Sequence, residues 1–240
     1  KMLNKLNLKC DYLFTHNYKI GKMYKLFSGG NIVPIGSFDS NLISKKKNNK
    51  KYEFTFISNY RHQASKHSKD IKFIHLLSKY VYQKGIKINA LGSHKTPSYR
   101  LHEFAFYKKI FKSNLIFIPR TKQRKTYKIL DESDLVINID STAGYEAASR
   151  GTKVGFFASK GKKIPYNTLK FGWPNKKQNK GLFWTDELKY SEIVRIINNL
   201  KKSKINNLEK TIKREMKDIM IFDSGNKIFL KVLNKLLKSN

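Results

Sequence analysis

The sequence predicts an α/β fold built around a parallel β-sheet. From Tyr52 onward, short apolar runs alternate with amphipathic stretches, as strands alternate with helices in βαβ units. The segment from Asp134 to Gly151 is a second indication, because an apolar run there passes through a polar turn directly into a helical pattern. With 40% hydrophobic and 13% aromatic residues the chain can also bury a core, so disorder is not expected.

Short apolar runs mark the strands of this sheet, and amphipathic stretches mark the helices between them. The predicted strands are Tyr52–Ile57, Ile86–Leu91, Leu115–Ile118, Asp134–Ile139 and Lys153–Phe157. The clearest helix is Asp70–Gln83, with Ser68 or Asp70 at its N-cap and Gly85 at its C-cap. Further helices are predicted at 97–111, at about 121–130, and at 144–150, where Gly151 closes the helix.

The residues before Tyr52 have a different character. Tyr12–Thr15 and Ile32–Ile35 are predicted strands and Ile20–Phe27 a helix, a βαβ piece too small to bury its own core. We therefore interpret residues 1–38 as the end of an N-terminal domain, and residues 39–51, which contain SKKKNNKK, as a polar linker. The chain then looks truncated at its front. The alternative is a single mixed domain with a strand added at one edge.

After the last predicted strand, the pattern becomes irregular and then helical. Residues 158–180 carry Pro165, Gly172 and Pro174, and the short run Gly181–Thr185 follows. A helix is expected at Tyr190–Leu200, which completes a main domain of residues 52–200. Two Lys-rich amphipathic helices, about 206–221 and 226–237, make up a C-terminal segment of residues 201–240. We expect these helices to pack on the protein, and a membrane-surface helix is the alternative.

The chain is strongly basic, with 50 Lys and Arg against 17 Asp and Glu and a formal net charge of +33. Clustered basic residues would indicate nucleic-acid binding, because they release counterions from phosphate backbones. Here the lysines are spread along the chain among abundant Asn, Ile, Tyr and Phe, a mixture that A- and T-rich codons also produce. We interpret most of them as solvated surface charge, and leave an anionic membrane or a phosphorylated ligand as alternative uses for the rest.

The single cysteine, Cys10, excludes a disulfide framework and fits a reducing compartment. No apolar run approaches the roughly 20 residues that cross a bilayer, and the first residues lack a signal-peptide pattern. We expect a soluble cytoplasmic protein, with the inner face of the membrane as the alternative location. The sequence has no GxxxxGK[ST] motif, no GxGxxG motif and no His/Cys cluster at metal-ligand spacing, so neither a metal nor a cofactor is expected.

The strand–turn–helix segment DLVINIDSTAGYEAASRG carries the strongest functional signal. Asp140, Ser141 and Thr142 stand where a parallel strand ends and a helix begins, and the backbone N–H groups and dipole there attract phosphate. Gly144 would let a ligand or a neighbouring backbone come close. Glu146 could accept hydrogen bonds from ribose hydroxyls. The structural alternative is that these residues only cap the helix.

Four segments resemble bacterial surface-carbohydrate biosynthesis transferases with a GT-B fold. They are ILDESDLVINIDSTAGYEAASRGTKVGFF at 129–157, FISNYRHQ at 56–63, FGWPNKKQNKGLFWT at 171–185 and GNIVPIGSFDSN at 30–41. The resemblance spans about residues 10–200. It implies that residues 52–200 form a Rossmann-like domain that binds a CMP- or UDP-linked sugar. It also implies that a glycan or lipid-linked acceptor binds on the side of the N-terminal domain, of which only a remnant is present.

The resemblance also implies which loops face the cleft between the two domains. Ser58, Asn59, Arg61 and His62 would line it, with Arg61 holding a diphosphate or carboxylate and His62 and Glu146 as catalytic candidates. Ser93 and His94 follow the second strand and Arg120 follows the third, near the expected position of the base. A solvated loop, a structural His94 and a surface Arg120 are the respective alternatives. Trp184 is expected to anchor its loop, and the role of Trp173 is open.

Three functions compete at this point. The first is glycosyl transfer from a nucleotide sugar to a surface glycan. The second is a GT-B sugar-nucleotide epimerase, which would need acid/base carboxylates in the cleft, with Glu103 and Glu146 as the candidates. The third is a nucleic-acid binder without a recognisable motif, and we expect no specific nucleic acid as partner.

Overall fold

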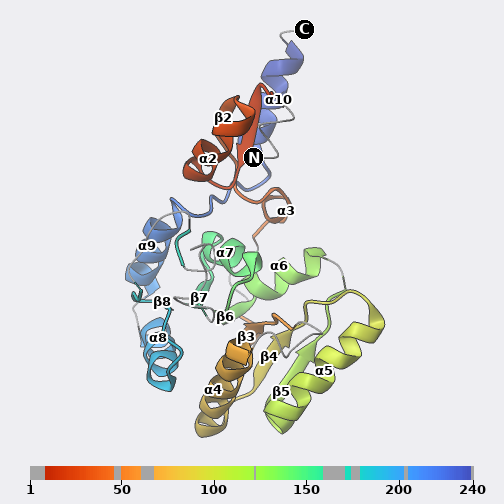
Figure 1. The fold of residues 1–240 in the computed structure, drawn as a ribbon, viewed down its shortest axis with the longest axis vertical. Helices are drawn as coiled ribbons and strands as arrows, with labels where there is room; N and C mark the ends of the chain where they lie inside the picture. Colours follow the sequence, from red (N-terminus) through yellow and green to blue (C-terminus); the bar gives the residue numbers. More distant parts are fainter. Residues whose placement is uncertain are drawn as a thin grey trace.

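The computed structural model describes residues 9–45, 50–60, 68–121, 123–158, 171–173, 179–202 and 205–238. Figure 1 shows two units, a large one around a β-sheet and a small one that carries the beginning of the described chain and also its last helix. The large sheet consists of parallel strands in the order β5-β4-β3-β6-β7-β8. Their bounds are Tyr52–Ile57 (β3), Ile88–Leu91 (β4), Leu115–Ile118 (β5), Ser133–Asn138 (β6), Lys153–Phe157 (β7) and Trp184–Thr185 (β8).

The direction of the strand order reverses between β3 and β6, which pair from Tyr52–Ser133 to Phe56–Ile137. Such a reversal opens a crevice at the carboxyl ends of the two central strands, where ligands of doubly wound sheets bind. Both strands are almost entirely buried, with Phe54, Phe56, Val136 and Ile137 fully enclosed. The mostly apolar runs that predicted these strands follow from this burial on both faces.

Helices cover both faces of the sheet. Their bounds are Ser68–Lys84 (α4), Pro97–Phe111 (α5), Gln123–Asp131 (α6), Thr142–Ser149 (α7), Tyr190–Lys202 (α8) and Ile205–Met216 (α9). Helix α4 packs against α5 and α8, whereas α7 packs against α6 and α9. The predicted α/β sheet is thereby confirmed, and most of the predicted elements match to within two residues. Gly85 has the positive φ of +60° expected where helix α4 ends.

The small unit is a two-stranded parallel sheet, β1 (Tyr12–Thr15) and β2 (Asn31–Pro34), joined by α2 (Tyr18–Ser28). The last helix, α10 (Lys227–Lys238), returns to this unit and lies beside it in Figure 1. The Phe229 ring of α10 contacts Phe14 of β1 and Phe38 of the short helix α3 (Phe38–Asn41), at centroid distances of 4.9 Å and 5.3 Å. The βαβ piece is too small to bury a core of its own. It therefore packs against a side chain of α10, from the other end of the chain.

Two predicted segments differ from the structure. The helix predicted to reach Ile221 ends at Met216, because the following backbone binds the small unit instead: the Ile219 carbonyl accepts the Asn17 side-chain amide at 2.7 Å, and Ile221 N–H donates to the His16 carbonyl. The predicted linker 39–51 begins inside helix α3, whose Asn41 is buried. Its side chain donates to the Ile35 carbonyl and to Asn226 Oδ1, and its Oδ1 accepts from Asp223 N–H.

Arg150, at the C-terminal end of α7, connects the two units from inside the protein. Its guanidinium forms a bidentate pair with Asp131, and both side chains are almost fully buried. The same group donates to the carbonyls of Ser40 and Ile43 at 2.8 Å and 2.9 Å, and it lies 4.7 Å from the Phe222 ring centroid. One side chain thus joins α6, α7, the segment after α3 and the segment before α10.

Replacing Arg150 by Ala should lower the free energy of unfolding by about 3–5 kcal/mol, because it leaves the Asp131 carboxylate buried without its partner. Urea denaturation followed by circular dichroism measures this change. Lys19→Ala is the matched control: it removes an exposed pair with Asp218, so its effect should stay below about 1 kcal/mol. Equal effects of the two substitutions would contradict the role assigned to Arg150.

Candidate functional site

The switch point of the large sheet holds a cavity of about 280 Å³. It lies where β3, β4 and β5 end and where α7 begins. Most of the site residues predicted from the sequence line it together, although they come from distant parts of the chain: Ser58, Ser93, Arg120, Ser141, Thr142 and Glu146. Parallel strands bring their carboxyl ends to one edge, which explains why a rule about strand ends finds residues that meet in space.

Glu103 of α5 organises the loops after β3 and β4. Its carboxylate is 0% exposed and accepts hydrogen bonds from the Ser58 hydroxyl, from the Ser93 N–H and hydroxyl at 2.9 Å each, and from His94 N–H at 3.3 Å. Ser58 also bonds the Tyr107 hydroxyl, and burial raises the pKa of Tyr107, which keeps this phenol protonated. Glu103 therefore holds the two loops whose residues Ser58 and Ser93 line the cavity, although Glu103 itself does not line it.

The junction between β6 and α7 is held by Asn138. Asn138 Oδ1 accepts from Ser141 N–H at 3.2 Å, and the Ser141 hydroxyl accepts from Ala143 N–H at 3.3 Å as the N-cap of α7. Gly144 is required here, because a Cβ on it would lie 2.2 Å from Asn138 Cγ. The close approach that we predicted for Gly144 is therefore made by a neighbouring side chain. At the beginning of α7 the Ala143 N–H donates to the Ser141 hydroxyl and the Gly144 N–H to the Ser141 carbonyl, which leaves the Thr142 N–H next to the cavity that Ser141 and Thr142 line.

Several buried polar atoms around this cavity lack a hydrogen-bond partner among the residues that the structure describes. They are Nε of Arg120, Nδ2 of Asn138 and both side-chain amide atoms of Asn59. Among the described residues, Arg120 donates from Nη1 to the Ser93 carbonyl at 3.0 Å. Buried polar groups are nearly always satisfied in folded proteins, so the unsatisfied Nε of Arg120, which of these three residues is the one that lines the cavity, favours a polar ligand there.

Glu146 lines the same cavity from the second turn of α7 and is 8% exposed. Its Oε1 accepts a hydrogen bond from the Ser37 hydroxyl, which belongs to the segment that leads out of the small unit. The helix-capping alternative does not describe Glu146, because the α7 cap is made by Ser141 alone. Glu146 instead connects the cavity to the small unit.

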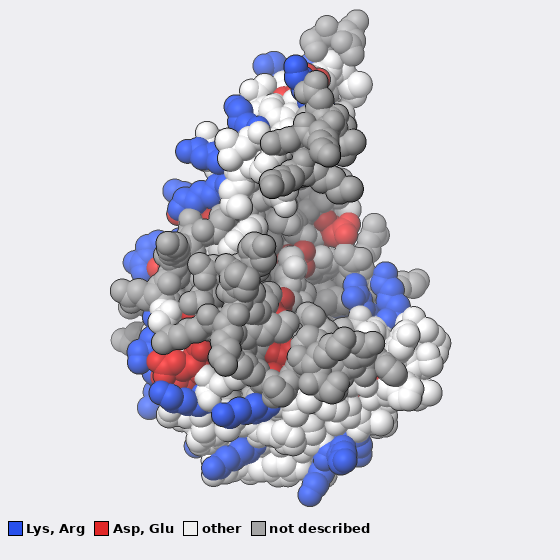
Figure 2. Space-filling view, in the orientation of Figure 1, with Lys and Arg blue, Asp and Glu red and all other residues white. Residues whose placement is uncertain are grey.

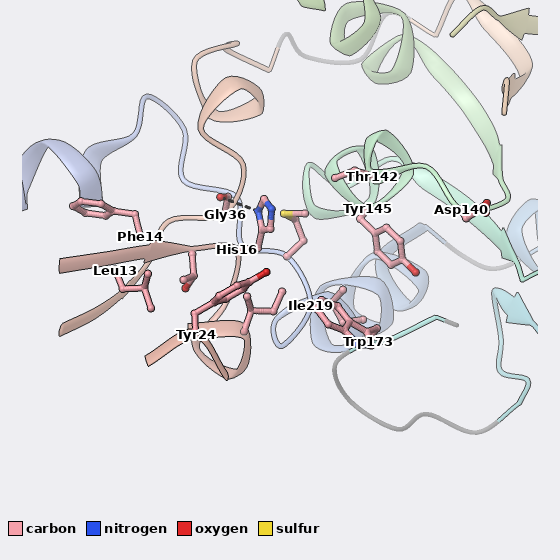
Figure 3. A pocket seen from close by; sticks show the side chains of 13 residues that line it. Leu13, Phe14, His16, Tyr24, Gly36, Asp140, Thr142, Tyr145, Trp173 and Ile219 are labelled. Carbon is pink, nitrogen blue, oxygen red and sulfur yellow. Dashed lines mark hydrogen bonds between the residues drawn. The ribbon is translucent and has the colours of Figure 1, made fainter. Parts of the chain in front are cut away.

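A second, larger cavity of about 710 Å³ lies between the two units. Figure 3 shows Leu13, Phe14, His16 and Tyr24 of the small unit on one side, and Thr142, Tyr145, Trp173 and Asp140 on the other. Thr142 lines both cavities, so they meet at the beginning of α7. Burial raises the pKa of Tyr145, with Asp140 and Asp186 adding to the shift, so its hydroxyl stays protonated.

The remaining predicted residues have other surroundings or lie outside the described residues. Arg61 and His62 fall in the undescribed segment 61–67, so their predicted roles stay predictions. His94 is held by a 3.0 Å contact from Nε2 to the Tyr60 carbonyl and by the rings of Tyr60 and Tyr99, which favours the structural alternative. Trp184 stacks on Phe171 at 4.7 Å, in keeping with the anchoring role expected for it.

In the view of Figure 2, Lys and Arg side chains lie along the left edge of the molecule and at its lower end. Lys and Arg side chains of the described residues form several separate groups on this face, with acidic side chains between them. Within the described parts of the chain, no group of three or more His, Cys, Asp or Glu side chains is placed to hold a metal ion. No described helix combines the length and apolar character needed to cross a membrane.

Comparisons with known proteins agree with this architecture. A family model described as "putative O-antigen biosynthesis protein" matches residues 2–237. A "putative UDP-N-acetylglucosamine 2-epimerase" from Listeria monocytogenes aligns with a TM-score of 0.58 at 12% identity, covering 96% of this chain and 61% of its own. The UDP-GlcNAc 2-epimerase from Neisseria meningitidis, solved with UDP-GlcNAc, gives 0.51 at 11% identity, with 94% and 61% covered.

Sucrose-phosphate synthase from Thermosynechococcus elongatus gives a TM-score of 0.50 at 11% identity, covering 99% of this chain and 61% of its own. The chain thus spans about six tenths of the length of these solved structures. At such identities the likeness concerns the fold, and it confirms the predicted Rossmann-like sheet of the GT-B class. A search of curated proteins gives no match.

Replacing Glu103 by Gln should lower the free energy of unfolding by about 1.5–3 kcal/mol, because an amide cannot accept all the hydrogen bonds that converge on a carboxylate. Thermal or urea unfolding measures the change. Glu53→Gln in β3 serves as control, since Glu53 makes only an exposed pair with Lys201 and should contribute less than about 1 kcal/mol. A Glu103→Gln protein as stable as the control would refute the role of Glu103 as a scaffold.

Proposed function

We propose, since this chain belongs to the family of O-antigen biosynthesis proteins, that it transfers a sugar from a nucleotide-linked donor in the synthesis of a surface polysaccharide. The observation that supports this most directly is the position of Thr142 at the beginning of α7. It lines both the smaller cavity at the switch point and the larger cavity between the units. A donor whose phosphate lies at Thr142 would have its nucleoside in the smaller cavity and its sugar in the larger one.

The beginning of α7 suits a phosphate for two physical reasons. The Thr142 N–H lies at the first position of the helix, where a backbone amide has no acceptor in a preceding turn, and the helix dipole favours a negative charge there. Ser141 and Thr142 add hydroxyl groups, and Arg120 adds a fixed positive charge whose Nε has no partner among the described residues. These groups could stabilise the departing phosphate without a metal, so we propose a metal-independent reaction without a cofactor, with a CMP- or UDP-linked sugar as substrate.

Glu146 and the loop after β3 complete the proposed donor site. Glu146 Oε1 is occupied by the Ser37 hydroxyl, and we assign Oε2 to the ribose hydroxyls. Asn59 carries an unsatisfied donor and an unsatisfied acceptor in its side chain, which suits a pyrimidine edge. Arg61 and His62, next along the chain, keep their proposed contacts with the diphosphate and the sugar.

The larger cavity suits a glycan or a lipid-linked acceptor. Its walls carry the aromatic rings of Tyr24, Tyr145 and Trp173, and apolar ring faces are the surfaces on which sugar rings and apolar chains pack. A cytoplasmic location and a peripheral contact with an anionic membrane, made by the Lys-rich helices, stay predictions.

The epimerase alternative has less support. Its two candidate carboxylates have different surroundings: Glu103 is fully buried and occupied by the hydrogen bonds of the neighbouring loops, and only Glu146 lines the cavity. A pair of carboxylates that acts as acid and base must have both members within reach of one sugar carbon. The fold itself is shared by epimerases and transferases and does not separate them.

A thermal-shift screen with CMP, CDP, UDP, GDP and a short DNA duplex tests the proposed donor site. A ligand that binds only the folded state raises the Tm with the logarithm of its concentration, so one pyrimidine nucleotide should raise it selectively. The double variant Ser141→Ala/Thr142→Ala should lose this shift. Ser149→Ala is the matched control, because it removes a hydroxyl from the opposite end of the same helix.

The opposite pattern would reject the proposal. A Tm raised by the DNA duplex and by no nucleotide, with an effect that disappears steeply as salt increases, would make the basic charge the main functional feature.

A further inference from the structure

The wall of the larger cavity that faces α7 carries a histidine at the end of a parallel strand. His16 directly follows β1 and is exposed, and it lines the cavity together with Asp140 and Thr142 from the other unit. Figure 3 shows its ring on the small unit's side of the cavity, next to Gly36. His16 and the beginning of α7 therefore face the same space from opposite units.

The hydrogen bond of His16 determines which ring nitrogen carries the proton. Nδ1 lies 3.1 Å from the Gly36 carbonyl oxygen, which can only accept. In the neutral ring Nδ1 must therefore hold the hydrogen, and Nε2 keeps a free lone pair. The tautomer with the proton on Nδ1 is the one that leaves Nε2 free to accept a proton.

The backbone around His16 is fixed by residues that are themselves buried. Thr15 donates its hydroxyl to the Asn17 carbonyl at 2.8 Å, and Asn17 caps α2 and reaches the Ile219 carbonyl. Gly36, which supplies the carbonyl for the ring, has a φ of +74°, and a Cβ there would lie 1.9 Å from the Ile221 carbonyl oxygen. The acceptor that selects the tautomer therefore has a defined position, which only glycine permits.

We infer that His16 is the general base of the proposed transfer, an assignment that rests on the proposed donor site. Nε2 removes the proton from the acceptor hydroxyl while its oxygen attacks the anomeric carbon of the donor sugar. The bond from that carbon to the phosphate oxygen breaks, and the electron pair leaves with the nucleotide at the beginning of α7. Nε2 then carries the proton, so charge and atoms balance. A positioned base of this kind contributes about 10²–10⁴-fold to the rate.

His16→Asn separates this role from a structural one. The Asn side-chain amide can occupy the position of Nδ1 and donate to the Gly36 carbonyl, but it has no atom in place of Nε2. We expect the variant to keep the Tm and the nucleotide affinity of the unmodified protein. Its nucleotide release from CMP-N-acetylneuraminate or UDP-N-acetylglucosamine should fall by about 10²–10⁴-fold. His75→Asn, an exposed histidine on α4, is the control that should change nothing.

Two measurements do not depend on turnover. In ¹⁵N–¹H correlation spectra of the histidine rings, the His16 signals, identified by their loss in His16→Asn, should show the proton on Nδ1. Diethyl pyrocarbonate should acylate His16 and His75, as detected by mass spectrometry. A bound nucleotide sugar should protect His16 but not His75, and the bare nucleotide should protect neither.

The outcomes distinguish this role from the proposed function. A nucleotide that raises the Tm while its sugar conjugate leaves His16 reactive overturns the role of His16 and leaves the donor site intact. A proton on Nε2, or full turnover in His16→Asn, overturns it as well. The absence of any nucleotide shift overturns the donor site, and the role of His16 with it. If the protein turns over neither CMP-N-acetylneuraminate nor UDP-N-acetylglucosamine, the test of the His16 role is whether a bound nucleotide sugar protects His16 from acylation.

Discussion

The architecture depends on one buried guanidinium. Arg150 is enclosed where α6, α7 and the segments on either side of the small unit meet, and its donors satisfy the Asp131 carboxylate and two backbone carbonyls. A charge in such a place is tolerable only when every partner is present, so the elements around it must take one arrangement. That arrangement fixes where the segments around Ser40 and Phe222 meet α6 and α7.

The smaller cavity depends on a second set of buried polar contacts. Glu103 accepts hydrogen bonds from the loops after β3 and β4. Asn138 packs on Gly144 and orients the first turn of α7. None of these three residues needs to touch a ligand. Their effect is to keep Ser58, Ser93, Ser141 and Thr142 together at the edge of one cavity. The site is therefore built before any ligand arrives, which reduces the entropy lost on binding.

The sequence was informative where local pattern and topology agree. The buried strands β3, β6 and β7 are largely apolar runs, and the strand-end rule together with the family resemblance found six residues of one cavity. It was uninformative where partners lie far apart in the chain. Nothing near Asn41 indicates that it bonds Asn226, 185 positions away, or that Glu103 would serve loops on two other strands. His16 also follows a strand, so the strand-end rule could have found it had it been applied to β1 as well.

The return of the chain to the small unit determines how the two units can move. The polypeptide passes between them twice, once near Gly36–Asn41 and once near Ile221–Asn226, and the two passages are joined by hydrogen bonds and by the close approach of Gly36 to Ile221. Two adjacent, mutually bonded crossings behave as one hinge axis: they permit a change of opening angle and resist twisting or sliding. Any closure of the cleft would then be a rotation about this axis. Because His16 and Gly36 lie at this axis, small rotations bring the far walls together while the histidine stays almost in place.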